Sequence, residues 1–179
     1  MLHSNTELLI DYWRERKREG LSPLRNAIEP AELSGLLPQV FILGRTDPGR
    51  WAFRLAGGLV TELHGRDLRQ LNVQALWDEA DRPRLAAAME ACRRSAEPFV
   101  AVAEARSARG VAPVELTFAP LVAETAPSDR IIGLYQPLES LEQLRGQPAD
   151  LRLRHIATAA ERGSPPRLRL AAVDGRRIA

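Results

Sequence analysis

The sequence contains one cysteine, Cys92, in 179 residues. A single thiol cannot form an internal disulfide or a cysteine zinc cluster, which excludes a disulfide-stapled scaffold and a zinc finger. No apolar run approaches the roughly 18 residues that a membrane span needs. The first residues also lack the basic and apolar regions of a secretory signal. These absences predict a cytoplasmic protein that does not enter a membrane.

Lysine is almost absent as well, because Lys17 is the only lysine among the 25 basic residues and the rest are arginine. Residues 1–140 carry a net charge of −2, and residues 141–179 carry a net charge of +4. The basic excess therefore lies in the C-terminal tail. One hypothesis is a nucleic-acid-associated regulator that uses this Arg-rich tail. So small a positive excess attracts the phosphate backbone only weakly, which argues against nucleic acid as a partner.

An amphipathic helix is predicted at the start of the chain, over residues 5–19, capped by Asn5 or Thr6 and ended at Gly20. Its apolar residues recur at helical spacing and form one face. That face is interpreted in two ways: it packs on the protein's own core, or it contacts a partner or a second copy of the chain. The face consists of Leu8, Leu9, Tyr12 and Trp13.

The rest of the chain predicts an α+β fold, a five-stranded antiparallel sheet with helices packed on one face. Residues 1–38 form an N-terminal helical cap, residues 39–138 the domain, and residues 139–179 a C-terminal helix and a basic, partly flexible tail. A lone strand is predicted at 167–170. Within the cap and the domain, we expect helices at 29–38, 59–63 and 80–95, and strands at 39–45, 50–56, 98–106, 114–118 and 130–136.

This order of elements resembles a PAS domain over residues 20–138. The local matches are Leu36 to Leu43, the segment Arg54-Leu55-Ala56-Gly57, and the segment Glu62 to Leu68 with its Gly-Arg-Asp-Leu. Together they resemble a family of stand-alone PAS proteins from alphaproteobacteria. The resemblance implies a sensor or scaffold module, because PAS domains bind small ligands between sheet and helices or mediate signalling contacts. Fold alone does not decide between these functions.

The first hypothesis is a non-enzymatic signalling adaptor that acts through contacts with a partner protein and as a homodimer. Arg54, expected on the sheet face away from the core, joins the N-terminal helix as a candidate contact for an anion or a partner. The alternative is a sensor of a small-molecule ligand held between sheet and helices. Its pocket would be lined by Phe53, Leu55, Leu76, Trp77, Leu85, Met89, Phe118 and Leu134.

No cofactor is predicted. Flavin photosensors of this fold carry a reactive cysteine in the short helices, and residues 66–73 contain none. Haem-binding members use a histidine on the long helix, and residues 80–95 contain none, so flavin and haem are both disfavoured. Cys92 is interpreted as a buried structural thiol, and His64 as a turn or capping residue.

No catalytic residues and no metal site are predicted, and we expect the protein not to be an enzyme. The three histidines are scattered, without the spacing of a metal motif. Asp78, Glu79 and Asp81 lie together at a helix start, where the helix dipole explains them better than an acid–base pair.

Overall fold

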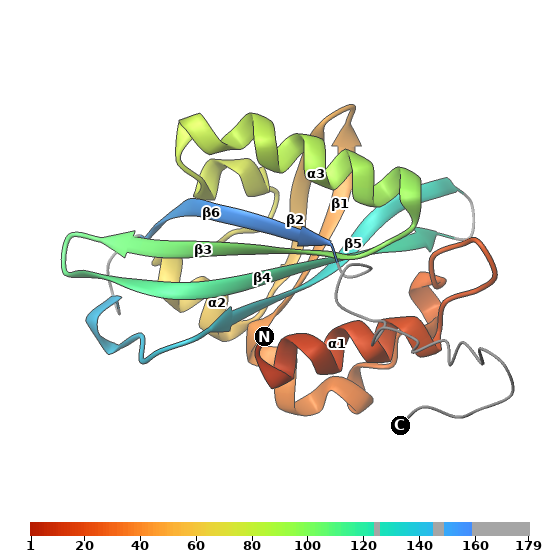
Figure 1. Cartoon of the computed structure of the whole chain (residues 1–179), viewed down its shortest axis with the longest axis horizontal. Helices are drawn as coiled ribbons and strands as arrows, with labels where there is room; N and C mark the ends of the chain where they lie inside the picture. The colour runs from red at the N-terminus through yellow and green to blue at the C-terminus, as the bar shows by residue number, and fades with distance from the viewer. Residues whose placement is uncertain (124–125, 145–148, 159–179) are drawn as a thin grey trace, which may run out of the picture.

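The computed structural model describes residues 1–123, 126–144 and 149–158. They form one antiparallel sheet in the order β2-β1-β5-β4-β3-β6, with helices against it (Figure 1). The strands are β1 Val40–Asp47, β2 Arg50–Ala56, β3 Phe99–Ser107, β4 Gly110–Ala123, β5 Ala126–Pro137 and β6 Asp150–Thr158. The α-helices are α1 Ser4–Glu15, α2 Gly58–His64 and α3 Arg82–Ser95, and the 3-10 helices are η1 Arg25–Ala27, η2 Pro30–Gln39, η3 Val73–Leu76, η4 Glu79–Asp81 and η5 Glu142–Leu144.

The sheet has six strands, so the predicted count of five is wrong. The additional strand is β6, which pairs along β3 from the pair Arg106–Asp150 to the pair Phe99–Thr158. Its residues alternate, with Leu151 and Leu153 buried and Arg152 exposed. That alternation is the pattern of a half-buried strand, and it was overlooked within a segment assigned to a C-terminal helix and tail. The predicted strand at 167–170 lies outside the described residues.

Helices cover both faces of the sheet: the domain helices α2 and α3 pack on one face, as predicted, and the helices α1 and η2 of the N-terminal cap pack on the other. In β4, Leu116 and Phe118 point toward α2 and α3, whereas Ala119 and Leu121 point toward α1 and η2. We call the first layer the α3-side core and the second the α1-side core. Figure 1 shows α1 and α3 on opposite sides of the strands. The strands β1, β4 and β5 are therefore buried on both faces over part of their length.

Gly133 in β5 is required by a close approach within the α3-side core. A Cβ atom at this position would lie 2.0 Å from Cζ of Phe41, whose ring occupies the space beside the glycine. Phe41 in turn packs edge-to-face with Phe53 and Phe118, with ring centroids 5.8 and 5.6 Å apart. The glycine thus makes room for an aromatic cluster at the centre of the sheet.

The N-terminal helix is shorter than predicted and begins with a different cap. His3 is the N-cap, and its Nδ1 accepts a hydrogen bond from the Asn5 amide at 3.1 Å. The helix ends at Glu15, with Arg16 as its C-cap. Gly20 has a φ of 67° in a separate turn, where Arg18 and Leu21 pair through their backbones. Asn5 and Thr6 lie within the first turn and do not cap it.

Candidate functional site

Six of the eight predicted pocket residues lie together in the α3-side core. They come from β2, β4, α3 and the segment before α3, and each is almost completely buried. The sheet and the helices α2 and α3 enclose them. The six are Phe53, Leu76, Trp77, Leu85, Met89 and Phe118.

Leu55 is placed differently, because a bulge interrupts β2. Phe53 pairs with Leu43 and Leu55 with Ile42, so Arg54 is an extra residue without a partner on β1. The bulge reverses the alternation that the sequence predicts. The side chain of Leu55 is therefore 49% exposed, on the outside of the α3-side core.

Leu134 also lies apart from the six predicted pocket residues in the α3-side core. It belongs to the α1-side core, together with Ile132. The neighbouring residues of β5, Ile131 and Tyr135, face the α3-side core instead. Because successive strand residues point to opposite faces, selecting Leu134 placed the pocket residue on the wrong side of β5.

The predicted contact face of α1 packs on the protein's own sheet. Leu9, Tyr12 and Trp13 are buried in the α1-side core, while Leu8 is 49% exposed. The indole Nε1 of Trp13 donates a hydrogen bond of 2.7 Å to the carbonyl of Pro120 in β4. The Tyr12 hydroxyl donates to Glu32 at 3.0 Å and accepts from the Glu29 amide at 2.8 Å. Three of the four residues therefore pack within the chain itself.

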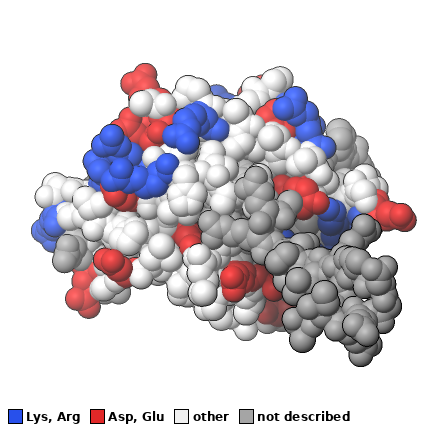
Figure 2. Space-filling model, viewed as in Figure 1, with Lys and Arg blue, Asp and Glu red and all other residues white. Residues whose placement is uncertain are grey.

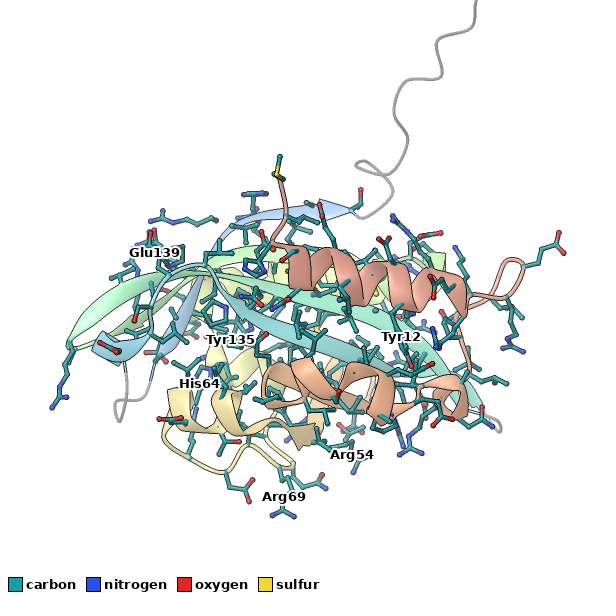
Figure 3. All side chains as sticks on the ribbon, turned by 90° about the horizontal axis from the view of Figure 1, so that it is seen from below. Tyr12, Arg54, His64, Arg69, Tyr135 and Glu139 are labelled. Atoms are coloured by element: carbon teal, nitrogen blue, oxygen red, sulfur yellow. The ribbon has the colours of Figure 1, made fainter. Side chains whose placement is uncertain are left out.

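Two polar residues in the α3-side core were missed by sequence reasoning. His64, the last residue of α2, is 1% exposed, and Tyr135 of β5 is likewise buried. Their rings meet edge-to-face with centroids 5.7 Å apart, and Figure 3 shows both side chains in the interior. Nδ1 of His64 lies 2.8 Å from the carbonyl oxygen of Ala149. The available signal was the position of His64 directly after the apolar run of α2, which places it on a buried turn.

The protonation states of this pair follow from their burial. A carbonyl oxygen only accepts, so Nδ1 of His64 carries the proton and Nε2 is an acceptor. Burial lowers the pKa of His64 to about 4, and the ring is neutral at pH 7. Burial likewise raises the pKa of Tyr135, which keeps its hydroxyl protonated as a donor.

Neither polar atom has a hydrogen-bond partner among the described residues. Nε2 of His64 and the hydroxyl of Tyr135 are both buried and unpaired, and so is Nε1 of Trp77. The Trp77 backbone pairs with Leu151 in β6, two residues after the Ala149 carbonyl that holds His64. Buried polar atoms without partners are rare and costly. An acceptor and two donors are therefore left without partners in this core.

Other polar groups considered in the sequence have structural partners. Cys92 is buried as predicted, with its Sγ 3.7 Å from the Phe118 carbonyl, and burial raises the pKa of its thiol. Asp78 accepts a hydrogen bond from the Ala80 amide at 3.1 Å as the cap of η4. Asp81 accepts from the Leu153 amide at 2.8 Å and ties β6 to the start of α3. These carboxylates serve the fold.

Within the part of the chain that the structure describes, no three His, Cys, Asp or Glu side chains are grouped so as to hold a metal ion. Across the same residues, no helix has both the length and the apolar character needed to cross a membrane. Figure 2 shows acidic and basic side chains interspersed on the displayed face.

The sequence was compared with known families and with curated proteins. A family model described as "PAS domain" matches residues 1–136. This match begins in the N-terminal segment and includes every element through β5 except the last residue of that strand. No curated protein matches the chain. The narrower resemblance to alphaproteobacterial stand-alone proteins stays a prediction.

Proposed function

Since the chain belongs to the PAS domain family, a family of sensory and signalling modules, we propose that it is a non-enzymatic sensor of a small ligand. The ligand is bound in the α3-side core and carries a hydroxyl or an equivalent group. The observation that carries the proposal is the unpaired acceptor–donor couple of His64 and Tyr135. The sensor hypothesis therefore replaces the homodimeric adaptor as the first choice.

The couple specifies the chemistry of the ligand group. Nε2 of His64 needs a donor, and the Tyr135 hydroxyl needs an acceptor. One hydroxyl can serve both atoms, since it donates one hydrogen bond and accepts others. A carboxylate or a ketone would leave His64 Nε2 without a donor, and an ammonium group would leave the Tyr135 hydroxyl proton without an acceptor. The surrounding residues are apolar, so the remainder of the ligand is expected to be apolar too.

The adaptor hypothesis loses its original support, because the α1 face that motivated it is buried within the chain. Contact with a partner through another surface remains compatible with a sensor, since a ligand in the core requires a surface that transmits the signal. The proposed absence of enzymatic activity is supported by the enclosure of His64 and by the structural use of Asp78 and Asp81.

Native mass spectrometry of the protein, purified without unfolding, tests the proposal. We expect a native mass above an integer multiple of the chain mass, with the excess lost on denaturation. Tyr135→Phe removes the donor while keeping the ring, and we expect it to reduce the liganded fraction at least about fivefold, since losing one hydrogen bond costs about 1 kcal/mol. Tyr12→Phe, which removes the other tyrosine hydroxyl outside this core, should leave the excess unchanged.

Two results would contradict the sensor. If the native mass is an integer multiple of the chain mass without excess, the protein retains no ligand and the core is structural. If an excess mass survives unchanged in Tyr135→Phe, the bound molecule lies elsewhere.

A further inference from the structure

A groove of about 410 Å³ lies on the surface beside the bulge of β2. It is formed by the end of β2, α2 and the segment after α2. In Figure 3 the labelled Arg54 and Arg69 lie at the same margin of the molecule, away from His64 and Tyr135. We call this feature the Arg54 groove. It is lined by Arg54, Leu55, Ala56, Thr61, Asp67 and Arg69.

The walls of the Arg54 groove are held by backbone hydrogen bonds. The amide of Phe53 donates to the carbonyl of Leu71 at 3.0 Å, and the amide of Gln70 donates to the carbonyl of Phe53 at 2.9 Å. Asp67 accepts a hydrogen bond from the Arg69 amide at 2.9 Å, which fixes the turn before that segment. The groove is thus preformed, which lowers the entropy cost of binding.

Two guanidinium groups meet over Gly44 of β1, and one of them, that of Arg54, belongs to the groove lining. A Cβ atom on Gly44 would lie 2.6 Å from Nε of Arg54 and 2.9 Å from Nη1 of Arg130, so the missing side chain makes room for both cations. Arg54 donates to the Gln70 side chain at 3.3 Å and has no ion pair among the described residues. Among the residues that the structure describes, Arg130 forms an ion pair only with its neighbour Asp129, at 3.4 Å. Positive charge is therefore left over at this point.

Exposed apolar side chains lie beside this charge. Leu55 is 49% exposed and belongs to the groove lining, and Leu37 at the end of η2 is 42% exposed. The backbone of Leu37 lies close to the end of β2, because a Cβ on Gly57, directly after that strand, would lie 2.4 Å from the Leu37 carbonyl oxygen. Arginine beside an exposed aliphatic anchor is the composition of a protein-contact surface.

We propose that the Arg54 groove docks an acidic segment of a partner protein, in which an aspartate or glutamate lies next to an aliphatic residue. The carboxylate binds between Arg54 and Arg130, where a guanidinium makes paired hydrogen bonds to it. The aliphatic side chain covers Leu55. This surface is separate from the ligand core, so the proposal holds whether or not the core binds a ligand.

Charge favours this occupant over two others. A second copy that presented the same groove would bring Arg54 and Arg130 against identical cations, and like charges at an interface are unfavourable. The chain's own segment 159–179 contains five arginines and two acidic residues, so its charge has the wrong sign.

A random dodecapeptide library displayed on phage, selected on the immobilised full-length protein, tests the docking. We expect the selected peptides to be enriched in aspartate or glutamate next to leucine, isoleucine or valine. Arg54→Gln should weaken the selected consensus peptide about tenfold in isothermal titration calorimetry, since a charge-assisted hydrogen bond is lost. Leu55→Ser should weaken it about fivefold. Arg109→Gln, an exposed arginine in the turn between β3 and β4, is the matched control and should bind like the unmodified protein.

Circular dichroism establishes first that each variant folds, as expected for substitutions of exposed residues. The proposal is overturned if the selected peptides show no acidic enrichment, or if Arg54→Gln and Arg109→Gln bind the consensus equally. It is also overturned if the protein self-associates in analytical ultracentrifugation and Arg54→Gln abolishes that association, because the occupant is then a second copy.

Discussion

The two faces of the sheet bury tyrosine and tryptophan side chains whose polar atoms are treated differently. On the α1 side, Trp13 donates to Pro120 and Tyr12 is bonded to Glu29 and Glu32. On the α3 side, neither Trp77 Nε1 nor the Tyr135 hydroxyl has a partner among the described residues. Burying a polar atom without a partner costs free energy, so the first pair serves the fold and the second is where we propose that a ligand binds.

The largest expected effect comes from removing the anchor of the α1 side. Trp13→Ala deletes a fully buried indole and its hydrogen bond to Pro120, and should lower the free energy of unfolding by about 3–5 kcal/mol. Leu8→Ala, on the exposed side of the same helix, should change it by less than about 0.5 kcal/mol. Urea unfolding followed by circular dichroism measures both. Equal small effects would show that α1 does not pack on the sheet.

The next largest effect is a pH dependence of the free energy of unfolding, caused by His64 on the α3 side. His64 has a folded pKa of about 4 and an ordinary pKa of 6.5, so between these values the unfolded chain binds a proton that the folded chain does not. The free energy of unfolding should therefore fall as the pH drops from about 6.5 toward 4, by at most about 3 kcal/mol.

Urea unfolding at several pH values measures this loss, and His64→Phe should flatten the curve in that window. The lowered pKa of Glu90 gives a loss in the same direction, but only below its ordinary value of 4.5. An unchanged slope in His64→Phe would assign the pH dependence to other groups.

The smallest effect is the difference in the free energy of unfolding between two Tyr→Phe variants. It is measured on protein that has been refolded from urea and dialysed, so that no ligand is retained. Tyr12→Phe breaks hydrogen bonds and leaves the Glu29 amide without its acceptor, so it should cost about 1–2 kcal/mol. Tyr135→Phe removes an unpaired hydroxyl and should be neutral or slightly stabilising. If Tyr135→Phe is the more costly substitution, the Tyr135 hydroxyl has a partner in the unliganded protein and the contrast between the faces fails.

Much of the fold followed from local patterns. The hairpin of β1 and β2 and the helix α3, with Leu85, Met89 and Cys92 buried, were predicted from apolar spacing. The alternation of apolar and polar residues in β6 is equally regular, but no strand was predicted there. Leu55 could not be placed, because the bulge at Arg54 is a property of strand pairing and not of β2 alone.

The candidate site was predicted only as an apolar layer. Phe53, Leu85 and Phe118 were identified because apolar residues at strand and helix spacing are usually buried. The polar members were missed, since the position of His64 after the apolar run of α2 is a weak local signal of burial. Its burial depends on residues such as Ala149 and Tyr135, which are far away in the chain, and its neutral state follows from that burial.

The sequence by itself determined the class of fold, the position of most strands and helices, and the resemblance to PAS domains, because apolar periodicity and turn residues act over a few neighbouring positions. Only the tertiary structure decided which side of the sheet each element covers and which buried polar atoms are left without partners. Those properties arise where α2, β5 and the segment before β6 meet, and no stretch of the sequence contains all three.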